Sequence, residues 1–208
     1  MSVDAVTLEV YLHIPPKARG IVVFAHGSGS GRNSPRNLHV ARILNNSGLA
    51  TLLFDLLTAR EEVEDELTAC LRFDIPLLAG RLVGATDWLT KNADTMNFKA
   101  GYFGASTGAA VAIVAAVERP KVRAIVSRGG RPDPGQVSAL PVVKAPTLLI
   151  VGGEDDVVIG LNQRAYDQIE AEKELVVIHG ATHLFEEPGT LEEVARLASD
   201  WFIKHFGG

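Results

Sequence analysis

The sequence has only one cysteine, and it lacks both an excess of basic residues and a long apolar run. The lone Cys70 in 208 residues excludes an internal disulfide framework. Lysine and arginine number 20 against 25 aspartate and glutamate, and the net charge of −5 argues against a nucleic-acid-binding protein. The longest apolar run, at positions 109–117, is far too short to span a bilayer. We therefore expect neither a nucleic acid nor a membrane as a partner.

The chain also lacks recognisable targeting and linker segments. Residues 1–4 show neither the basic nor the apolar region of a signal peptide, so we expect a cytoplasmic location. No Gly/Ser/Pro-rich stretch divides the chain, and its 47% hydrophobic residues suit a globular protein with one well-filled core. We predict a single domain over residues 1–208 that acts as a monomer or homodimer.

What the sequence does contain is an alternation of short apolar runs and helical periodicities. Seven runs are predicted as strands, namely an edge strand at 8–14 and further strands at 21–25, 51–54, 100–103, 122–127, 147–151 and 175–178. Helices are predicted near 38–46, 73–92, 109–117 and 161–170, and a last helix from a capping box at 190–193. This alternation predicts an α/β fold with a mostly parallel, doubly wound sheet of about seven strands, whose functional sites lie at the carboxyl ends of the strands.

One predicted strand is followed directly by a serine between two glycines. Residues 104–108 are Gly-Ala-Ser-Thr-Gly, which fits the pattern G-x-S-x-G. A sharp turn from strand to helix would hold Ser106 in a strained, exposed conformation, and side chains at 104 or 108 would collide with neighbouring elements. The five-residue pattern alone also occurs by chance in flexible loops, but the strand before it and the helix after it favour a nucleophile.

A serine nucleophile needs a base and an orienting carboxylate, and two later strands end in such residues. The strand at 147–151 is followed by Gly-Gly-Glu-Asp-Asp, in which Asp155 fits the turn spacing best, and Asp133 on the preceding connection is the alternative. The strand at 175–178 is followed by His-Gly-Ala-Thr-His, which places His183 on the next loop. His179, at the strand's own end, is expected to pack or hydrogen-bond structurally. The order serine, acid, histidine is the one expected for this architecture.

A glycine-rich loop follows the strand at 21–25 and allows a competing interpretation. In a dinucleotide-binding protein, Gly27, Gly29 and Gly31 would approach a pyrophosphate, and Asp55 at the end of the next strand would bind a ribose. These glycines fall at every second position and do not form G-x-G-x-x-G. This interpretation also leaves the placement of the serine, the acid and the histidine unexplained.

Taken together, the motifs resemble the α/β-hydrolase superfamily, and within it the dienelactone-hydrolase-like serine hydrolases. The likeness covers essentially the whole chain, with residues 103–108 matching the nucleophile elbow, Gly152-x-x-Asp155 the acid turn, Gly180-x-x-His183 the histidine loop and residues 26–28 the oxyanion loop. The resemblance implies an α/β-hydrolase fold and a catalytic triad of Ser106, Asp155 and His183. Because only a loop and a short helix fit between the strands at 122–127 and 147–151, no separate cap domain is expected.

The resemblance also implies how the site would work. In that family the oxyanion is held by backbone N–H groups, which correspond here to Ser28 and Thr107, and His26 is expected to fix the oxyanion loop through hydrogen bonds. Neither a metal nor an organic cofactor is implied. The enzyme that names the branch uses cysteine, so Ser106 favours an ordinary ester or thioester over dienelactone. The implied activity is hydrolysis of a small-molecule acyl substrate, a carboxylic ester, thioester or lactone, through an acyl-serine intermediate. The alternative is a hydrolase-fold protein that binds a ligand without turnover.

Two groups of charged residues remain. Arg128 follows the strand that ends at Ser127, so we expect it near the mouth of the site, where it would bind an anionic ester or lactone. The alternative is that Arg128 is a surface arginine paired with an acid.

Five acids lie in residues 61–66, but no histidine is interleaved with them. This pattern favours a solvated loop or helix face over a metal site.

Overall fold

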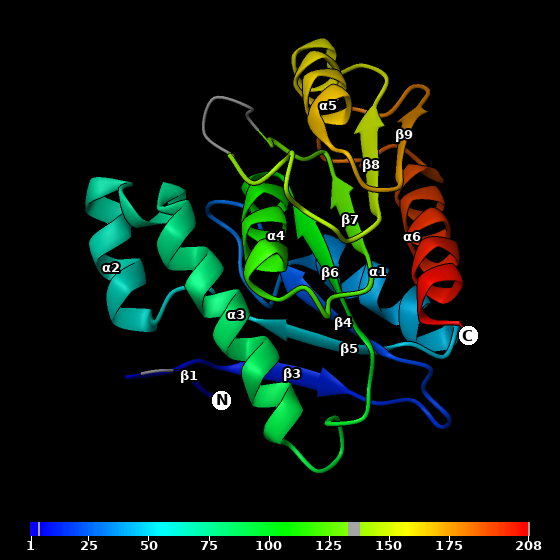
Figure 1. The fold of residues 1–208 in the computed structure, drawn as a ribbon. Helices are drawn as coiled ribbons and strands as arrows, with labels where there is room; N and C mark the ends of the chain where they lie inside the picture. The colour runs from blue at the N-terminus through cyan, green and yellow to red at the C-terminus, as the bar shows by residue number, and fades with distance from the viewer. Residues whose placement is uncertain (4, 133–137, 208) are drawn as a thin grey trace.

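The structure, a computed structural model, describes residues 1–3, 5–132 and 138–207. Its centre is a seven-stranded sheet in the order β3-β5-β4-β6-β7-β8-β9, parallel except for β3 (Figure 1). Its strands are β3 (Val10–His13), β4 (Ile21–Ala25), β5 (Ala50–Phe54), β6 (Ala100–Ala105), β7 (Ile125–Arg128), β8 (Thr147–Gly152) and β9 (Lys173–Ile178). A short antiparallel pair, β1 (Ser2–Val3) and β2 (Val6–Thr7), lies outside the sheet. The predicted α/β fold with a mostly parallel sheet is confirmed.

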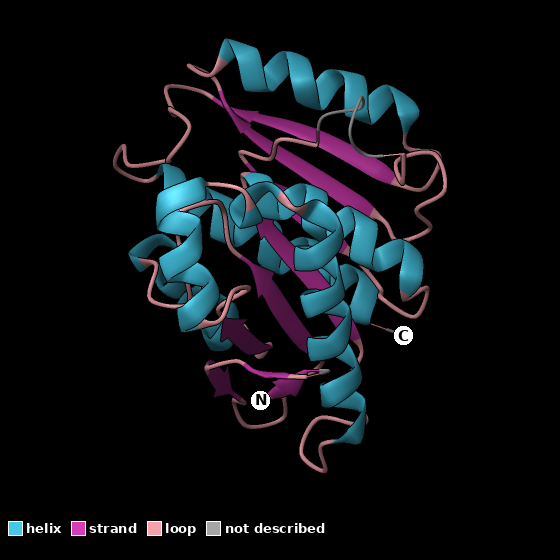
Figure 2. Cartoon of the chain, turned by 90° about the vertical axis from the view of Figure 1, so that its left-hand side faces the viewer, coloured by secondary structure: helices cyan, strands magenta, loops and turns pink. Residues whose placement is uncertain are grey.

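Helices cover both faces of this sheet. The helices are α1 (Pro35–Asn46), α2 (Ala59–Thr68), α3 (Ile75–Lys91), α4 (Thr107–Glu118), α5 (Asp156–Gln168) and α6 (Thr190–Phe206), with a 3₁₀ turn η1 (Leu71–Phe73). One apolar cluster joins α3, α4 and α5 to the sheet, and a second joins α1 and α6 to its other face. Figure 2 shows the progressive twist of the strands that the helices follow. The sheet is therefore doubly wound, as predicted.

Burial follows from the position of each strand in the sheet. All five residues of β4 and all five of β5 are buried, because these largely apolar strands have a neighbour on each side and helices over both faces. The edge strand β3 instead alternates between half-buried and exposed residues. Because the central strands run parallel to one another, their carboxyl ends meet along one rim of the sheet, which carries the loops described below.

Some element ends differ from the predictions for identifiable reasons. Helix α1 begins at Pro35, earlier than predicted, because the Ser34 hydroxyl caps it by accepting a hydrogen bond from Asn37 N at 3.4 Å. The predicted capping box at Thr190 is wrong. Thr190 is the first residue of α6, and its hydroxyl donates to the Glu187 carbonyl at 2.8 Å. Strand β7 includes Arg128, one residue beyond its predicted end.

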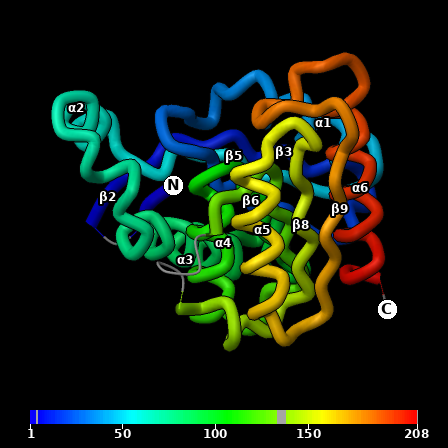
Figure 3. Tube along the Cα trace, turned by 90° about the horizontal axis from the view of Figure 1, so that it is seen from above, coloured from blue at the N-terminus to red at the C-terminus, as the bar shows by residue number. Residues whose placement is uncertain are grey.

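The acid-rich segment forms helix α2, which projects at the side of the molecule when it is seen from above (Figure 3). It opens with a capping box, in which Thr58 N donates to Glu61 at 2.7 Å and Glu61 N donates to the Thr58 hydroxyl at 3.2 Å. Within the described ranges, none of the helices combines the length and the apolar character needed to cross a membrane.

Candidate active site

Ser106 occupies a strained turn between β6 and α4. Its φ of 50° and ψ of −119° lie in a backbone region that residues other than glycine rarely adopt. Three hydrogen bonds hold this conformation: Ser106 N donates to the Arg128 carbonyl, and Ala109 N and Arg131 N both donate to the Ser106 carbonyl, each at 3.1 Å. The turn therefore lifts the Ser106 side chain above the rim of the sheet, as a nucleophile elbow does.

The two glycines of this turn are there because the chain approaches itself closely. A Cβ at Gly104 would lie 2.5 Å from the Gly108 carbonyl oxygen, and one at Gly108 would lie 2.1 Å from the Ala25 carbonyl oxygen. Both distances are far below van der Waals contact, so the predicted collisions at 104 and 108 are confirmed. Gly27 fits against the same turn, since its Cβ would lie 3.1 Å from Ser106 Cβ.

The structure brings the three predicted triad residues together. His183 Nε2 lies 3.3 Å from Ser106 Oγ, and His183 Nδ1 lies 2.7 Å from Asp155 Oδ2. Since an ionised carboxylate only accepts, Nδ1 carries the proton donated to Asp155, which leaves the lone pair of Nε2 facing the serine hydroxyl. The Asp155 side chain is 17% exposed and that of His183 36%, so the base lies at the surface and its carboxylate beneath it. The alternative acid, Asp133, lies outside the described residues.

Close packing of two turns places Asp155 under His183. Asp155 caps α5, accepting from Val158 N at 3.4 Å, and this leaves its second oxygen for the histidine. A Cβ at Gly152 would lie 2.4 Å from the Ala181 carbonyl oxygen, which itself accepts from Glu154 N at 2.9 Å. Glycine at 152 thus allows the acid turn to touch the histidine loop.

The histidine loop is also fixed on its other side. Thr182 donates to Glu187 through its hydroxyl at 2.7 Å and through its backbone N at 3.1 Å. Phe185 is buried at 1% exposure and has a positive φ of 56°. Glu187, through its bonds to Thr182, and the buried Phe185 therefore position the backbone on both sides of His183.

The oxyanion loop is anchored by His26. Leu56 N donates to His26 Nε2 and His26 Nδ1 donates to the Gly27 carbonyl, both at 3.0 Å. Burial lowers the pKa of His26, which keeps the ring neutral and suits a ring that both donates and accepts. The amides of Ser28 and Thr107 donate no hydrogen bond within the described part of the chain, so both N–H groups are free to bind an oxyanion.

Asp55 and Arg32 hold the far end of the same loop. Asp55 accepts from Arg32 N at 2.7 Å and forms an ion pair with the Arg32 guanidinium, which also contacts Glu9. A Cβ at Gly31 would lie 2.7 Å from Asp55 Oδ1. The acid that the dinucleotide interpretation assigned to a ribose is therefore occupied in shaping the loop. Sequence analysis missed the role of Arg32, because the pairing joins residues far apart in the chain.

A cavity of about 570 Å³ lies beside the oxyanion loop. It is lined by residues 26–36 and 55–57, by Glu62, Asp65 and Glu66 of α2, and by Arg72 and Leu78. The acids of α2 are partly committed: Glu61 pairs with Arg81 at 2.7 Å, and Asp65 accepts from Arg72 Nε at 2.6 Å. Among the described residues, no group of three or more acids, histidines or cysteines is arranged to hold a metal ion.

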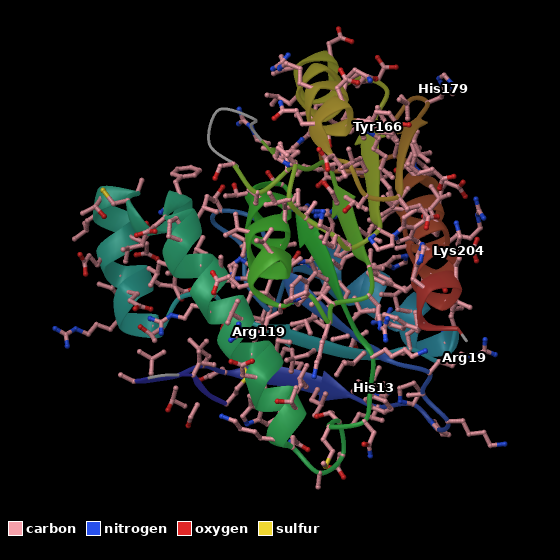
Figure 4. The ribbon with its side chains drawn as sticks, in the orientation of Figure 1. His13, Arg19, Arg119, Tyr166, His179 and Lys204 are labelled. Atoms are coloured by element: carbon pink, nitrogen blue, oxygen red, sulfur yellow. The ribbon has the colours of Figure 1, made fainter. Side chains whose placement is uncertain are left out.

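Two site expectations need correction. Arg128 is neither at the mouth of the site nor a paired surface residue, because it is the last residue of β7 and only 7% exposed. His179, expected to pack or hydrogen-bond, is exposed at the end of β9 (Figure 4).

Sequence analysis also missed Asn162, a fully buried residue of α5. Its side-chain amide donates to the Gly130 carbonyl at 2.8 Å and so ties the turn after β7 to that helix. No sequence signal points to this role, because the predicted helix at 161–170 is largely polar and one more polar residue does not stand out in it.

Comparison with known proteins extends these observations. A model of the dienelactone hydrolase family matches residues 8–204. A crystal structure of dienelactone hydrolase from Anabaena variabilis is 62% identical, with a TM-score of 0.95 over 98% of this chain and 94% of that one. Est1E from Butyrivibrio proteoclasticus has a TM-score of 0.81 over 100% of this chain and 98% of its own, but at 18% identity this shows a shared fold alone.

Longer relatives also match. A putative phosphoribosyl transferase of Mycobacterium tuberculosis is 59% identical over 199 residues, which make up 95% of this chain but 44% of that protein. The chain thus spans less than half the length of these curated relatives.

Proposed function

Because the chain belongs to the dienelactone hydrolase family, we propose that it is a serine hydrolase that cleaves a small carboxylic ester, thioester or lactone through an acyl-serine intermediate. The observation that carries the proposal is the chain of two hydrogen bonds from Ser106 Oγ through His183 to Asp155, at 3.3 and 2.7 Å. The activity named for the longer Mycobacterium relatives is not transferred, because this chain spans only 44% of them.

In the proposed acylation step, Ser106 Oγ attacks the substrate's carbonyl carbon while His183 Nε2 takes the hydroxyl proton. The carbonyl oxygen becomes an oxyanion, which the free amides of Ser28 and Thr107 bind. Asp155 stabilises the resulting imidazolium through its hydrogen bond to Nδ1. The C–O or C–S bond then breaks, and His183 returns the proton to the departing alcohol or thiol.

In the proposed deacylation step, His183 deprotonates a water molecule that attacks the acyl-serine ester. The second oxyanion collapses, the bond to Ser106 Oγ breaks, and the serine recovers its proton from His183. The product is a carboxylic acid, or the hydroxy acid of an opened ring when the substrate is a lactone. These steps use only groups of this chain and water.

The test is covalent labelling at the nucleophile. A fluorophosphonate reacts with a serine that has a base to deprotonate it, so stoichiometric modification of Ser106 is expected, together with hydrolysis of p-nitrophenyl acetate. Ser106→Ala and His183→Ala should each abolish the adduct, located by peptide mass spectrometry. Turnover should fall to the residual rate provided by binding and the oxyanion donors.

The control is the surface histidine His179, which is exposed at the end of β9. Exposed histidines cleave activated esters slowly, so ester cleavage that persists in Ser106→Ala but is lost in His179→Ala would not be enzymatic turnover. A folded protein that stays unmodified at Ser106 while it binds a nicotinamide dinucleotide would contradict the proposal in favour of the dinucleotide interpretation. A protein that does neither would be a non-catalytic binding protein.

A further inference from the structure

Asn162 of α5 is a polar side chain in the interior of the protein. It is fully buried, and its Nδ2 donates to the Val158 carbonyl of its own helix and to the Gly130 carbonyl, both at 2.8 Å. Its Oδ1 is also buried and accepts no hydrogen bond within the described residues. An unpaired buried oxygen is costly, and a leucine of similar size would avoid it. The two donated bonds are therefore what an amide contributes at this position.

The glycine carbonyl that accepts from this amide belongs to the turn at residues 129–131, which contacts both the nucleophile and the base. Arg131 N donates to the Ser106 carbonyl at 3.1 Å. A Cβ at Gly129 would lie 3.1 Å from the His183 carbonyl oxygen and 3.6 Å from His183 Cε1, so the backbone of the turn lies against the imidazole. A shift of this turn would therefore change the separation of Ser106 Oγ and His183 Nε2.

Asn162 also connects this turn to the triad acid. Asp155 caps α5 and accepts from Val158 N at 3.4 Å, and the carbonyl of the same Val158 accepts from Asn162. Contacts therefore run from Asp155 through Val158 and Asn162 to the turn, and from the turn to the Ser106 backbone. This path joins the acid to the serine without passing through His183. The triad is thus held together a second time, from beneath.

We propose that Asn162 is a positioning residue of the triad, which holds the turn at residues 129–131 where it keeps Ser106 Oγ within reach of His183 Nε2. These two atoms are 3.3 Å apart, beyond the usual range of about 2.6–3.2 Å, so a small displacement of the turn would separate them. The residues that line the cavity of about 570 Å³ all lie between positions 26 and 78, so Asn162 acts on the reacting groups and not on binding in that cavity. The proposal rests on the proposed function, since it concerns the same triad.

The kinetic test uses Asn162→Leu, which removes both donated bonds at nearly constant size. Acylation and deacylation use the same serine and histidine, so both steps should slow together. On p-nitrophenyl acetate, kcat should fall about 10- to 100-fold with KM little changed, since a misplacement of about 1 Å can cost about 100-fold. The second-order rate of fluorophosphonate labelling at Ser106 should fall by a similar factor. An unchanged kcat, or a change in KM alone, would overturn the proposal.

Ala165→Gly is the control that separates position from stability. Ala165 is buried one turn further along α5, and a glycine there weakens the same helix while the bonds of Asn162 remain. Both variants should lower Tm, but only Asn162→Leu should lower kcat. If kcat fell equally in both, the loss would follow from a weakened helix, and the positioning role would be refuted.

A second variant, Asn162→Ser, isolates the bond to the turn and serves if Asn162→Leu does not fold. A serine hydroxyl inside a helix donates to the carbonyl four residues earlier, so the bond to Val158 is replaced and the one to Gly130 is lost. Its kcat should fall as in Asn162→Leu. A folded Asn162→Ser protein with the kcat of the wild type would show that the bond to Gly130 is not needed, and would overturn the proposal.

Native-state hydrogen exchange keeps the two proposals distinguishable, because it needs no turnover. In Asn162→Leu the amides of Ser106 and Arg131 should exchange about 10-fold faster relative to the amides of β4, as expected when one hydrogen bond no longer holds the turn locally. In Ala165→Gly this ratio should stay as in the wild type. Faster local exchange in a wild-type background that hydrolyses no ester would support the placement by Asn162 while the proposed function failed. Unchanged exchange and unchanged kcat in an active enzyme would refute the positioning role alone.

Discussion

The two halves of the site are held together in different ways. The triad half consists of Ser106, Asp155 and His183, whose side chains contact one another directly at 3.3 and 2.7 Å. The loop half, residues 26–34, presents a backbone amide, and the side chains of His26 at one end and Arg32 at the other fix its backbone. Side-chain chemistry therefore defines the first half, and backbone placement defines the second.

Two aspartates make the comparison concrete. Asp55 follows β5 and Asp155 follows β8, and each accepts a backbone hydrogen bond, from Arg32 N at 2.7 Å and from Val158 N at 3.4 Å. Their second oxygens differ in partner, because Asp55 faces a guanidinium that is always charged and Asp155 faces an imidazole, a ring that can both donate and accept a proton. The same residue type after a parallel strand therefore anchors a loop in one half and orients a histidine ring in the other.

The largest expected effect comes from the triad half. Asp155→Asn should lower kcat by about 10⁴-fold, because the amide no longer holds the imidazole in the tautomer that leaves Nε2 free. Asparagine remains a good helix cap, so α5 and the fold should persist, as circular dichroism would check. Asp156→Asn, at the exposed neighbouring position, is the control. A larger loss in Asp133→Asn than in Asp155→Asn, with both variants folded, would move the acid to the connection after β7.

The triad half was predictable from the sequence because its signals are local. Glycines within three residues of Ser106, Asp155 and His183 mark turns that the chain must make at these points. The fold followed from the alternation of apolar runs, since parallel strands buried on both faces leave continuous apolar segments such as β4 and β5. Periodicity and turn chemistry sufficed for both.

The loop half and Arg128 were not predictable in this way. The contact between Arg32 and Asp55 joins residues 23 positions apart, and no local pattern records it. Arg128 was misplaced because the predicted strand ended one residue too early. Strand positions alternate between faces, so a single residue separates a side chain on the α1 and α6 face from one in a surface loop. Strand ends are the least certain part of a sequence prediction, and here the error changed the environment of a charged group.

A smaller loss of activity is expected in the loop half. His26→Ala removes the ring that accepts from Leu56 N and donates to the Gly27 carbonyl, so the Ser28 amide should lose its fixed position. Because one oxyanion donor is affected and the triad is not, kcat should fall by up to about 10²-fold, while labelling of Ser106 persists. The exposed His13 lies at the far end of the edge strand β3 (Figure 4), and His13→Ala serves as the control. An unchanged kcat in His26→Ala would show that the loop keeps its place without this ring.

Lowering the pH should lower the free energy of unfolding through His26, a residue of the loop half. Burial lowers the pKa of His26 below its ordinary 6.5, so below that pH the unfolded chain binds a proton that the folded protein resists. The stabilisation is therefore present above pH 6.5 and lost as the pH falls through the folded-state pKa. Urea unfolding between about pH 8 and pH 5 should show a steeper decline for the wild type than for His26→Ala. Parallel curves would mean that His26 takes up its proton without cost.

The smallest expected effect tests which contact of Arg32 matters. Asp55 is 14% exposed and Glu9 is 74% exposed, and both pair with the same guanidinium, itself 19% exposed. Asp55→Asn weakens a half-buried ion pair and should lower the free energy of unfolding by about 1–2 kcal/mol, discounted for partial exposure. Glu9→Gln removes a solvated charge, so its effect should stay within about 0.5 kcal/mol. Urea titrations of both variants, with p-nitrophenyl acetate turnover as a second readout, measure the difference. Equal losses in the two variants would show that the exposed contact with Glu9 anchors the loop half as strongly as Asp55 does. If neither variant lost stability, His26 alone would hold the loop.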